Sequence, residues 1–122
     1  MNKTILVVED VESMSKVLLE KFSAEPYKII AAKDGAEGLE MALKEHPDLI
    51  LLDIIMPKML GIDMVKKLRE DEWGKTANVI ILSNLNDVQH ISEAFNNGVF
   101  DYYIKSDTKI NDLIQKIKEK LD

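Results

Sequence analysis

The chain has 122 residues, 46% of them hydrophobic and 31% charged, which is enough to build the core of one domain spanning residues 1–122. Its 16 basic and 22 acidic side chains give a net charge of −6, which argues against direct binding to nucleic acid or to anionic lipid. The absence of cysteine excludes disulfides and thiolate chemistry, and without a signal-peptide pattern or an apolar run long enough to span a membrane we expect a cytoplasmic protein.

Five short apolar runs recur along the chain and predict five β-strands. The first, third and fourth are hydrophobic almost throughout, as in strands that helices cover on both faces. The runs are 4–8, 27–31, 49–52, 79–82 and 100–104.

Segments with helical periodicity lie between these strands and after the last one. Asp34 with Glu37, and Asn86 with Gln89, have the spacing of an N-cap and its reciprocal residue. Trp73-Gly74 is expected to end the helix after the third strand. The stripes expected on the helices are Met14, Val17, Leu18 and Phe22; Ile62, Val65 and Leu68; Val88, Ile91 and Phe95; and Ile110, Leu113, Ile114, Ile117 and Leu121.

The repeated alternation of strand and helix predicts an α/β fold with five βα units. Right-handed crossovers with short connections favour an open, doubly wound sheet. Five units are too few for a closed eight-stranded barrel. We therefore expect a flavodoxin-like three-layer sandwich whose parallel five-stranded sheet has the order 2-1-3-4-5.

Polar side chains follow four of the five predicted strands. Glu9 and Asp10 follow the first strand, Asp53 the third, Ser83 the fourth and Lys105 the fifth. In the predicted order these strands are neighbours, and the carboxyl ends of parallel strands share one edge of the sheet. Each residue alone is typical of a strand end or a helix cap, but together they predict a site at this edge.

Three carboxylates at such a site repel one another unless one is protonated or a cation binds. Mg²⁺ fits the oxygen ligands and keeps open positions for water and phosphate oxygens. Asp53 would then be the nucleophile toward a phosphoryl group and form an acyl phosphate. Lys105 would neutralise the phosphoryl oxygens, and the Ser83 hydroxyl would donate a hydrogen bond to them.

The motifs at these strand ends resemble the receiver domain of two-component response regulators, over essentially the whole chain. They are the acidic pair after Ile5-Leu6-Val7-Val8, the block Asp53-Ile54-Ile55-Met56-Pro57 followed by Gly61, the hydroxyl of Ser83, and Asp101-Tyr102-Tyr103-Ile104-Lys105. The resemblance implies a phospho-acceptor switch rather than a turnover enzyme, with at most slow self-phosphorylation and self-dephosphorylation.

The resemblance also implies a role for each site residue. Asp53 would accept a phosphoryl group from a sensor histidine kinase or a phosphotransfer protein. Asp10 and the main-chain carbonyl of Ile55 would bind Mg²⁺ together with Asp53, and Glu9 would act largely through a bound water. Lys105 would pair with the phosphoryl group or with Asp53 itself.

The switch implied by the resemblance involves Ser83 and Tyr102. Ser83 would move toward the phosphoryl group and Tyr102 would rotate inward with it, changing the face of the fourth helix, fifth strand and fifth helix. The protein would be a monomer or a phosphorylation-dependent homodimer.

Several positions depart from the family's usual pattern. Ser106 follows Lys105 where a proline with a cis peptide bond is usual, which predicts either a trans bond with a rebuilt loop or a retained cis bond that costs about 2.5–4 kcal/mol. Leu60 replaces the commoner aspartate, and Asn84 replaces a small residue. Ile55 and Leu85 flank the expected path of hydrolytic water and cannot orient it, which predicts an acyl phosphate that lasts longer than in relatives with polar residues at these positions.

Three alternatives share parts of this pattern. A flavin-binding electron carrier would need a glycine- or hydroxyl-rich phosphate loop after the first strand, where this chain is acidic. An aspartyl-phosphate hydrolase usually has a second acid two residues after its nucleophile, where this chain has Ile55. A receiver-like domain that signals without phosphate should have lost the five site residues, and they are present.

Overall fold

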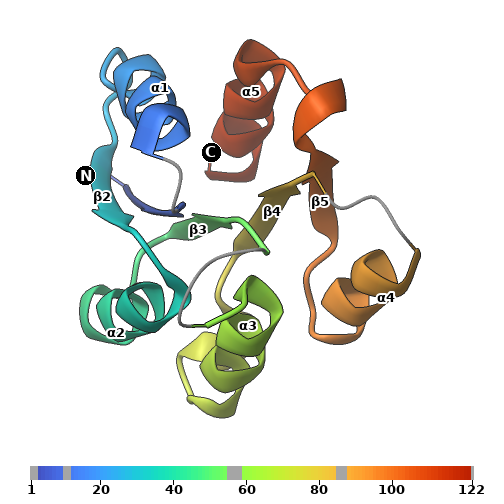
Figure 1. The fold of residues 1–122 in the computed structure, drawn as a ribbon. Coiled ribbons are helices and arrows are strands. Elements are labelled where there is room, and N and C mark those ends of the chain that lie inside the picture. The colour runs from blue at the N-terminus through green and yellow to red at the C-terminus, as the bar shows by residue number, and fades with distance from the viewer. Residues whose placement is uncertain (1–2, 10–11, 55–58, 85–87, 122) are drawn as a thin grey trace.

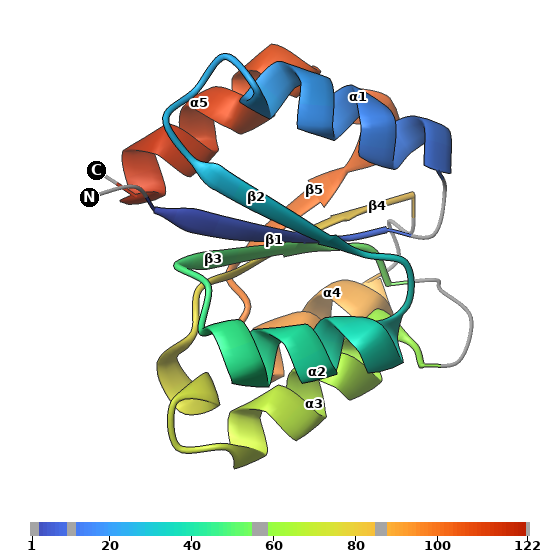
Figure 2. The same cartoon turned by 90° about the vertical axis from the view of Figure 1, so that its left-hand side faces the viewer.

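The computed structural model describes residues 3–9, 12–54, 59–84 and 88–121, except for the side chains of residues 12–15, 88 and 107. Five parallel strands form one sheet between two layers of helices (Figures 1 and 2). The strands are β1 (Thr4–Val8), β2 (Lys28–Ala32), β3 (Leu49–Leu52), β4 (Val79–Ser83) and β5 (Asp101–Ile104). The helices are α1 (Glu12–Phe22), α2 (Gly35–Glu45), α3 (Gly61–Glu70), α4 (Val88–Asn96) and α5 (Ile110–Leu121), with 3-10 helices η1 (Gly74–Thr76) and η2 (Lys105–Asp107).

The strand order is β2-β1-β3-β4-β5, which confirms the predicted flavodoxin-like arrangement. In the register of the sheet, Val8 lies opposite Leu52 and Ser83 lies opposite Ile104. The carboxyl ends of β1, β3, β4 and β5 therefore meet at one edge of the sheet, where the polar residues follow.

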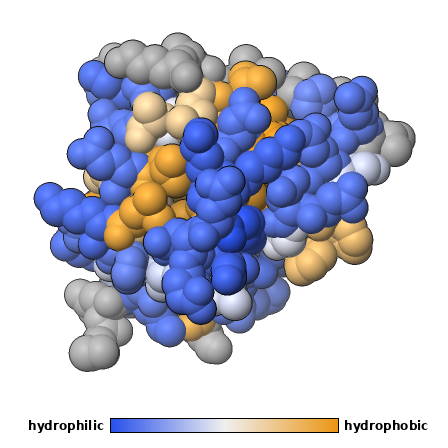
Figure 3. All heavy atoms as spheres, turned by 90° about the horizontal axis from the view of Figure 1, so that it is seen from below, coloured by the Kyte–Doolittle hydropathy of each residue, from blue (hydrophilic) through white to orange (hydrophobic). Residues whose placement is uncertain are grey.

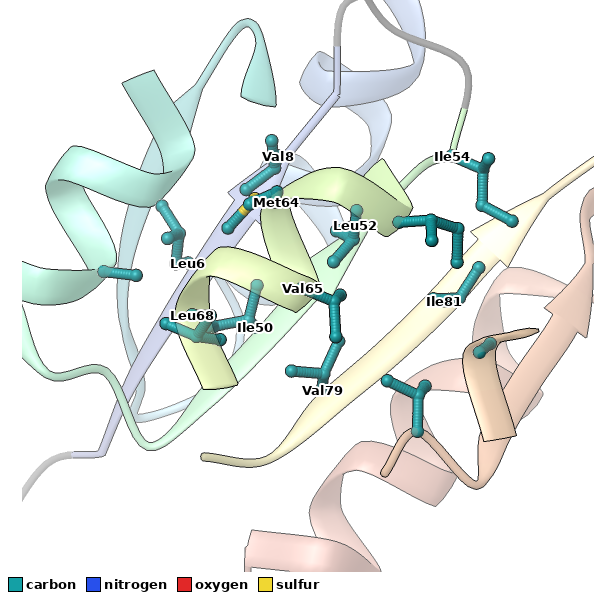
Figure 4. Packing of buried hydrophobic residues seen from close by; sticks show 14 of the residues in the cluster. Leu6, Val8, Ile50, Leu52, Ile54, Met64, Val65, Leu68, Val79 and Ile81 are labelled. Carbon is teal, nitrogen blue, oxygen red and sulfur yellow. The ribbon is translucent and has the colours of Figure 1, made fainter. Parts of the chain in front are cut away.

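The core has two halves, one on each face of the sheet, because successive strand residues point to opposite faces. Figure 4 shows the half beneath α2, α3 and α4, where Leu6, Val8 and Leu52 meet Met64 and Leu68 of α3. The other half lies under α1 and α5 and contains Ile5, Val7, Leu51, Leu18, Phe22, Leu113 and Ile117. Both faces of the sheet are covered, as the continuous apolar strands predicted.

Most predicted helix stripes are buried in the structure. Ile62, Val65 and Leu68 of α3 are at most 4% exposed, and in α5 the predicted residues from Leu113 to Leu121 are buried. The predicted cap of α2 is also present, because the Asp34 carboxylate accepts a hydrogen bond from the Glu37 N–H at 2.8 Å. The second predicted cap falls on Asn86, outside the described residues.

The stripe predicted for α4 is wrong as an inward face. Ile91 is 39% exposed and Phe95 is 59% exposed, whereas Ala94 is fully buried. Successive helical residues are rotated by about 100°, so a helix that packs through Ala94 turns Phe95 well away from the core. On α1, Val17 is likewise 40% exposed, although Leu18 of the same predicted stripe is buried.

The third helix ends earlier than Trp73-Gly74 predicted. It stops at Glu70, and Gly74 begins the separate helix η1. The carboxylate of Asp71 accepts a hydrogen bond from the Gly74 N–H at 3.1 Å and so fixes the turn between them. Trp73 instead stacks on His46, with ring centroids 4.3 Å apart. Among the described residues, no helix has the length and apolar character needed to cross a membrane.

Candidate functional site

Asp53 follows β3 at the carboxyl edge of the sheet, and its main chain still belongs to the strand pairing. Its N–H donates to the carbonyl of Val8 at 3.1 Å, so the neighbouring strand fixes its position. The Oδ1 atom accepts a hydrogen bond from the Ile54 N–H at 2.7 Å, which orients the carboxylate. The residue is 7% exposed, and a second carboxylate oxygen is left for other partners.

The ammonium of Lys105 connects two of the predicted acidic residues. Its Nζ lies 3.0 Å from Asp53 Oδ2 and 3.1 and 3.2 Å from the two carboxylate oxygens of Glu9. Glu9 is only 5% exposed, and its N–H donates to the carbonyl of Ala32 at the end of β2. Two buried carboxylates thus share one ammonium, and the described part of the site retains net negative charge.

The pKa of Lys105 reflects two opposing influences. Burial by itself lowers the pKa of the ammonium, but the hydrogen bonds and charges of Asp53 and Glu9 outweigh it and raise the pKa above its ordinary value of 10.5. Lys105 is therefore protonated at neutral pH and acts as a fixed positive charge beside Asp53.

The Lys105–Ser106 peptide bond is trans, which decides between the two alternatives that the sequence left open. The chain turns directly into η2 at Lys105 instead of making the usual proline turn. Lys105 nevertheless reaches Asp53, so the serine in place of proline does not misdirect the lysine.

Helix α3 begins against the main chain of Asp53. A Cβ on Gly61 would lie 2.2 Å from the carbonyl oxygen of Asp53, so only glycine permits this contact. Leu60, in place of the commoner aspartate, makes no side-chain cap. The Gly61 N–H donates to the carbonyl of Ile54 at 2.8 Å, so a main-chain bond satisfies one of the free N–H groups of the first turn.

Ser83 lies on β4, the strand next to β3 and Asp53, and Tyr102 lies on β5, the strand beyond it. Ser83 ends β4 and is 1% exposed, and Tyr102 of β5 is half-buried against the core beneath α3 and α4. Asn84, the departure that follows Ser83, is exposed. Asp10, Ile55 and Leu85 lie outside the described residues.

The structure thus brings together Glu9, Asp53 and Lys105 as the strand order predicted, and Ser83 ends the adjacent strand. The direct contact between Glu9 and Lys105 was not predicted, because Glu9 was expected to act through a water bound to the metal. The signal was available, since opposite charges follow β1 and β5 on the same edge of the sheet.

The donor atoms of the site suit a hard divalent cation. Carboxylate oxygens are the ligands that Mg²⁺ prefers, and Asp53 retains lone pairs beyond its bonds to Ile54 and Lys105. Among the described residues no three acidic or histidine side chains form a metal cluster; Asp10 is not one of those residues. Glu9 and Asp53 therefore fit as part of a Mg²⁺ site.

Comparison with known proteins identifies the family of this fold and site. The family model of the response regulator receiver domain matches residues 5–118. The chain belongs to this family. Receiver domains are regulatory signalling domains that accept a phosphoryl group in two-component signalling, and they generally bind Mg²⁺ at the acidic phosphorylation site.

Individual relatives support the assignment as a receiver domain. The polar-differentiation response regulator DivK of Brucella ovis is 31% identical over 121 residues, which cover 99% of this chain and 98% of DivK. The response regulator PleD of Caulobacter vibrioides is 34% identical over 105 residues, but the match spans only 23% of PleD. A CheY-like receiver domain structure from Methanospirillum hungatei superimposes with a TM-score of 0.91 at 28% identity, covering 100% of this chain and 95% of that one.

Proposed function

We propose that this receiver domain is the phospho-acceptor switch of a phosphorelay and that Asp53 accepts the phosphoryl group. The donor would be a phosphohistidine on a sensor histidine kinase or a phosphotransfer protein. The observation that supports this proposal most is the contact of 3.0 Å between the Lys105 ammonium and the carboxylate of Asp53, which is almost completely buried. A lysine in this position neutralises charge at the atom that would receive the phosphoryl group.

In the proposed transfer, a carboxylate oxygen of Asp53 attacks phosphorus and forms an acyl phosphate. The P–N bond to the donor imidazole breaks, and its electron pair goes to the imidazole nitrogen. Mg²⁺, when bound, supplies positive charge to the transferring oxygens. The Ile54 N–H holds the carboxylate in one orientation, and Lys105 provides a second positive charge from the protein.

Glu9, Asp10, Asp53 and the carbonyl of Ile55 would hold the Mg²⁺ ion. Glu9 already binds Lys105 through both of its carboxylate oxygens. The lysine and the metal ion therefore compete for the same negative charge. The phosphoryl oxygens would offer Lys105 a new partner, and Glu9 would then be available to hold the metal ion.

The proposed switch involves β4, which ends with Ser83, and β5, which contains Tyr102. Phosphorylation would replace the single negative charge of the Asp53 carboxylate with a phosphoryl group that carries a charge of about −2, and Ser83 would donate its hydroxyl to the new phosphoryl oxygens. Such contacts exist only in the phosphorylated state and so shift the population of conformers. Tyr102 is half-buried on the adjacent strand, and it would pack inward as Ser83 moves, changing the face of α4, β5 and α5.

Intact-mass analysis tests the acceptor. The chain is incubated with acetyl phosphate and Mg²⁺, and we expect one added phosphoryl group that disappears in Asp53→Asn. Asp63→Asn on the exposed side of α3 is the matched control, because it removes an aspartate of equal charge and should leave labelling unchanged. Labelling that persists in Asp53→Asn, or that never occurs in the unmodified chain, would overturn the proposal.

A further inference from the structure

A second concave site lies at the opposite edge of the sheet from Asp53. This cavity of about 250 Å³ opens beside the first residues of β4 and β5, whereas Ser83 and Lys105 lie at the other ends of these strands. None of the proposed phosphorylation residues lines it. We call it the Arg69 pocket, and its lining includes Arg69, Lys75, Phe100, Asp101 and Lys120.

Arg69 gives this pocket a rigid base. Its Nε donates to the carbonyl of Asn97 at 2.9 Å, its Nη1 to those of Gly74 and Ala77 at 2.7 and 2.8 Å, and its Nη2 to that of Gly98 at 3.1 Å. All four acceptors are main-chain carbonyls, and among the described residues no carboxylate pairs with the guanidinium. Burial lowers the pKa of Arg69, as expected for a charge that has left water without a counter-ion.

The pocket is basic in a chain that is acidic as a whole. Arg69, Lys75 and Lys120 line it, and Asp101 is the only acidic lining residue, although the net charge of the chain is −6. Asp101 is already paired with Lys120. Lys75 contacts Glu72 at 3.4 Å, but both side chains are more than half exposed, and such a pair is weak.

Exposed aromatic side chains form the rim of the pocket. Phe100 lines the pocket and is 69% exposed. Its ring packs edge to face with that of Phe95 on α4, with centroids 5.0 Å apart, and Phe95 is 59% exposed. Ile91, one turn earlier on α4, is 39% exposed. Figure 3, which looks onto the side of α2, α3 and α4, shows a mostly hydrophilic surface with separate apolar patches.

From this juxtaposition we infer that the Arg69 pocket and its Phe95–Phe100 rim bind a short acidic segment of a partner protein that carries an apolar side chain. A carboxylate of the segment would lie at Arg69 and Lys75, and the apolar side chain would pack on the two phenylalanine rings. A long polyanion would bring its remaining charges against an acidic surface, which disfavours nucleic acid. The site goes beyond the phospho-acceptor role because it uses none of the residues proposed for phosphoryl transfer, although Phe95, Asp101 and Lys120 belong to the α4, β5 and α5 elements of the proposed switch.

Peptide binding to the unphosphorylated chain tests this inference. The probe is a fluorescein-labelled, amidated peptide Asp-Asp-Leu-Phe-Asp-Asp, followed by fluorescence anisotropy. Two control peptides replace either all four acids by lysine or the central Leu-Phe by Ser-Ser. We expect each control to bind at least about tenfold more weakly, which corresponds to about 1.4 kcal/mol. Equal binding of the three peptides would overturn the inference.

Surface variants locate the binding. Phe100→Ser and Lys75→Glu should each weaken binding of the acidic peptide about fivefold or more. Leu43→Ser and Lys44→Glu on the exposed side of α2 are the matched controls and should not weaken it. Circular dichroism checks that the variants fold. Unchanged binding in Phe100→Ser and Lys75→Glu would overturn the inference.

Sedimentation of the chain tests whether a second copy of it covers the rim. The peptide assay and the phosphorylation assay of Asp53 are independent of each other. If the chain self-associates and Phe100→Ser abolishes that association, a second copy covers the rim and the inference is wrong. Because no phosphoryl donor is present in the peptide assay, failure to bind peptide leaves phosphorylation of Asp53 intact. Failure of phosphorylation likewise leaves the peptide result unaffected.

Discussion

Replacing Lys105 by methionine tests how far the site depends on its ammonium. This ammonium lies 3.0 Å from Asp53 and 3.1 Å from Glu9, whose side chains are only 9% and 4% exposed. Removing one partner of a buried ion pair costs about 3–5 kcal/mol, because the remaining charge stays buried without a partner. Since the Lys105 side chain keeps 11% of its surface exposed, we expect the lower end, a loss of about 3 kcal/mol in the free energy of unfolding.

For a chain of 122 residues this loss corresponds to a fall of about 12 °C in Tm. The assay is urea unfolding at neutral pH with EDTA, so that no divalent cation replaces the ammonium. Lys66→Met is the control, because Lys66 lies closer to its partner Glu93, at 2.8 Å, but the pair is 50% and 36% exposed. Water screens the ion pair of Lys66 and Glu93, so we expect little change in the free energy of unfolding of Lys66→Met. Equal losses in the two variants would refute the argument from burial.

Four further predictions follow from the site and its supports. Gly61→Ala should lower the free energy of unfolding by about 3 kcal/mol and reduce phosphoryl labelling, because its Cβ would collide with the Asp53 carbonyl; unchanged urea midpoint and labelling would contradict this. The stabilisation from Lys105 should be complete below pH 10.5 and lost as the pH rises through the raised pKa of the folded state. In urea unfolding, the free energy of unfolding of Lys105→Met should not show this loss at high pH. Arg69→Ala should cost at least about 3 kcal/mol, because four carbonyls lose a charged donor; a smaller loss on urea unfolding would contradict it. Ile55→Asn should speed loss of the phosphoryl group, followed by intact mass, and equal rates would count against the proposed role of Ile55.

Much of the fold could be predicted because burial leaves a direct mark on the sequence. The strands β1, β3 and β4 are buried on both faces, so their apolar runs are continuous. The predicted strand order, which the structure has, is enough to bring Glu9, Asp53 and Lys105 to one edge of the sheet. The predicted edge position of β2 was also correct.

Other features depend on neighbours that a single sequence does not specify. The stripe of Ile91 and Phe95 marks one side of α4, but only the packing of Ala94 decides which side faces the core. Arg69 lies in the last turn of α3, and two of the four carbonyls that it binds, those of Asn97 and Gly98, are 28 and 29 residues away in the sequence. The peptide bond before Ser106 was equally undecided, because the surrounding loop determines its geometry.

The contact between Gly61 and the carbonyl of Asp53 restricts where this molecule can move. No space remains for even one additional methyl group, so the beginning of α3 cannot slide past β3 without displacing the main chain of Asp53. This contact therefore restrains the end of β3 against the beginning of α3. If Asp53 is the acceptor, we expect phosphorylation to rearrange β4, β5 and the segments that follow them rather than β3, and successive donors would then encounter the carboxylate in the same place.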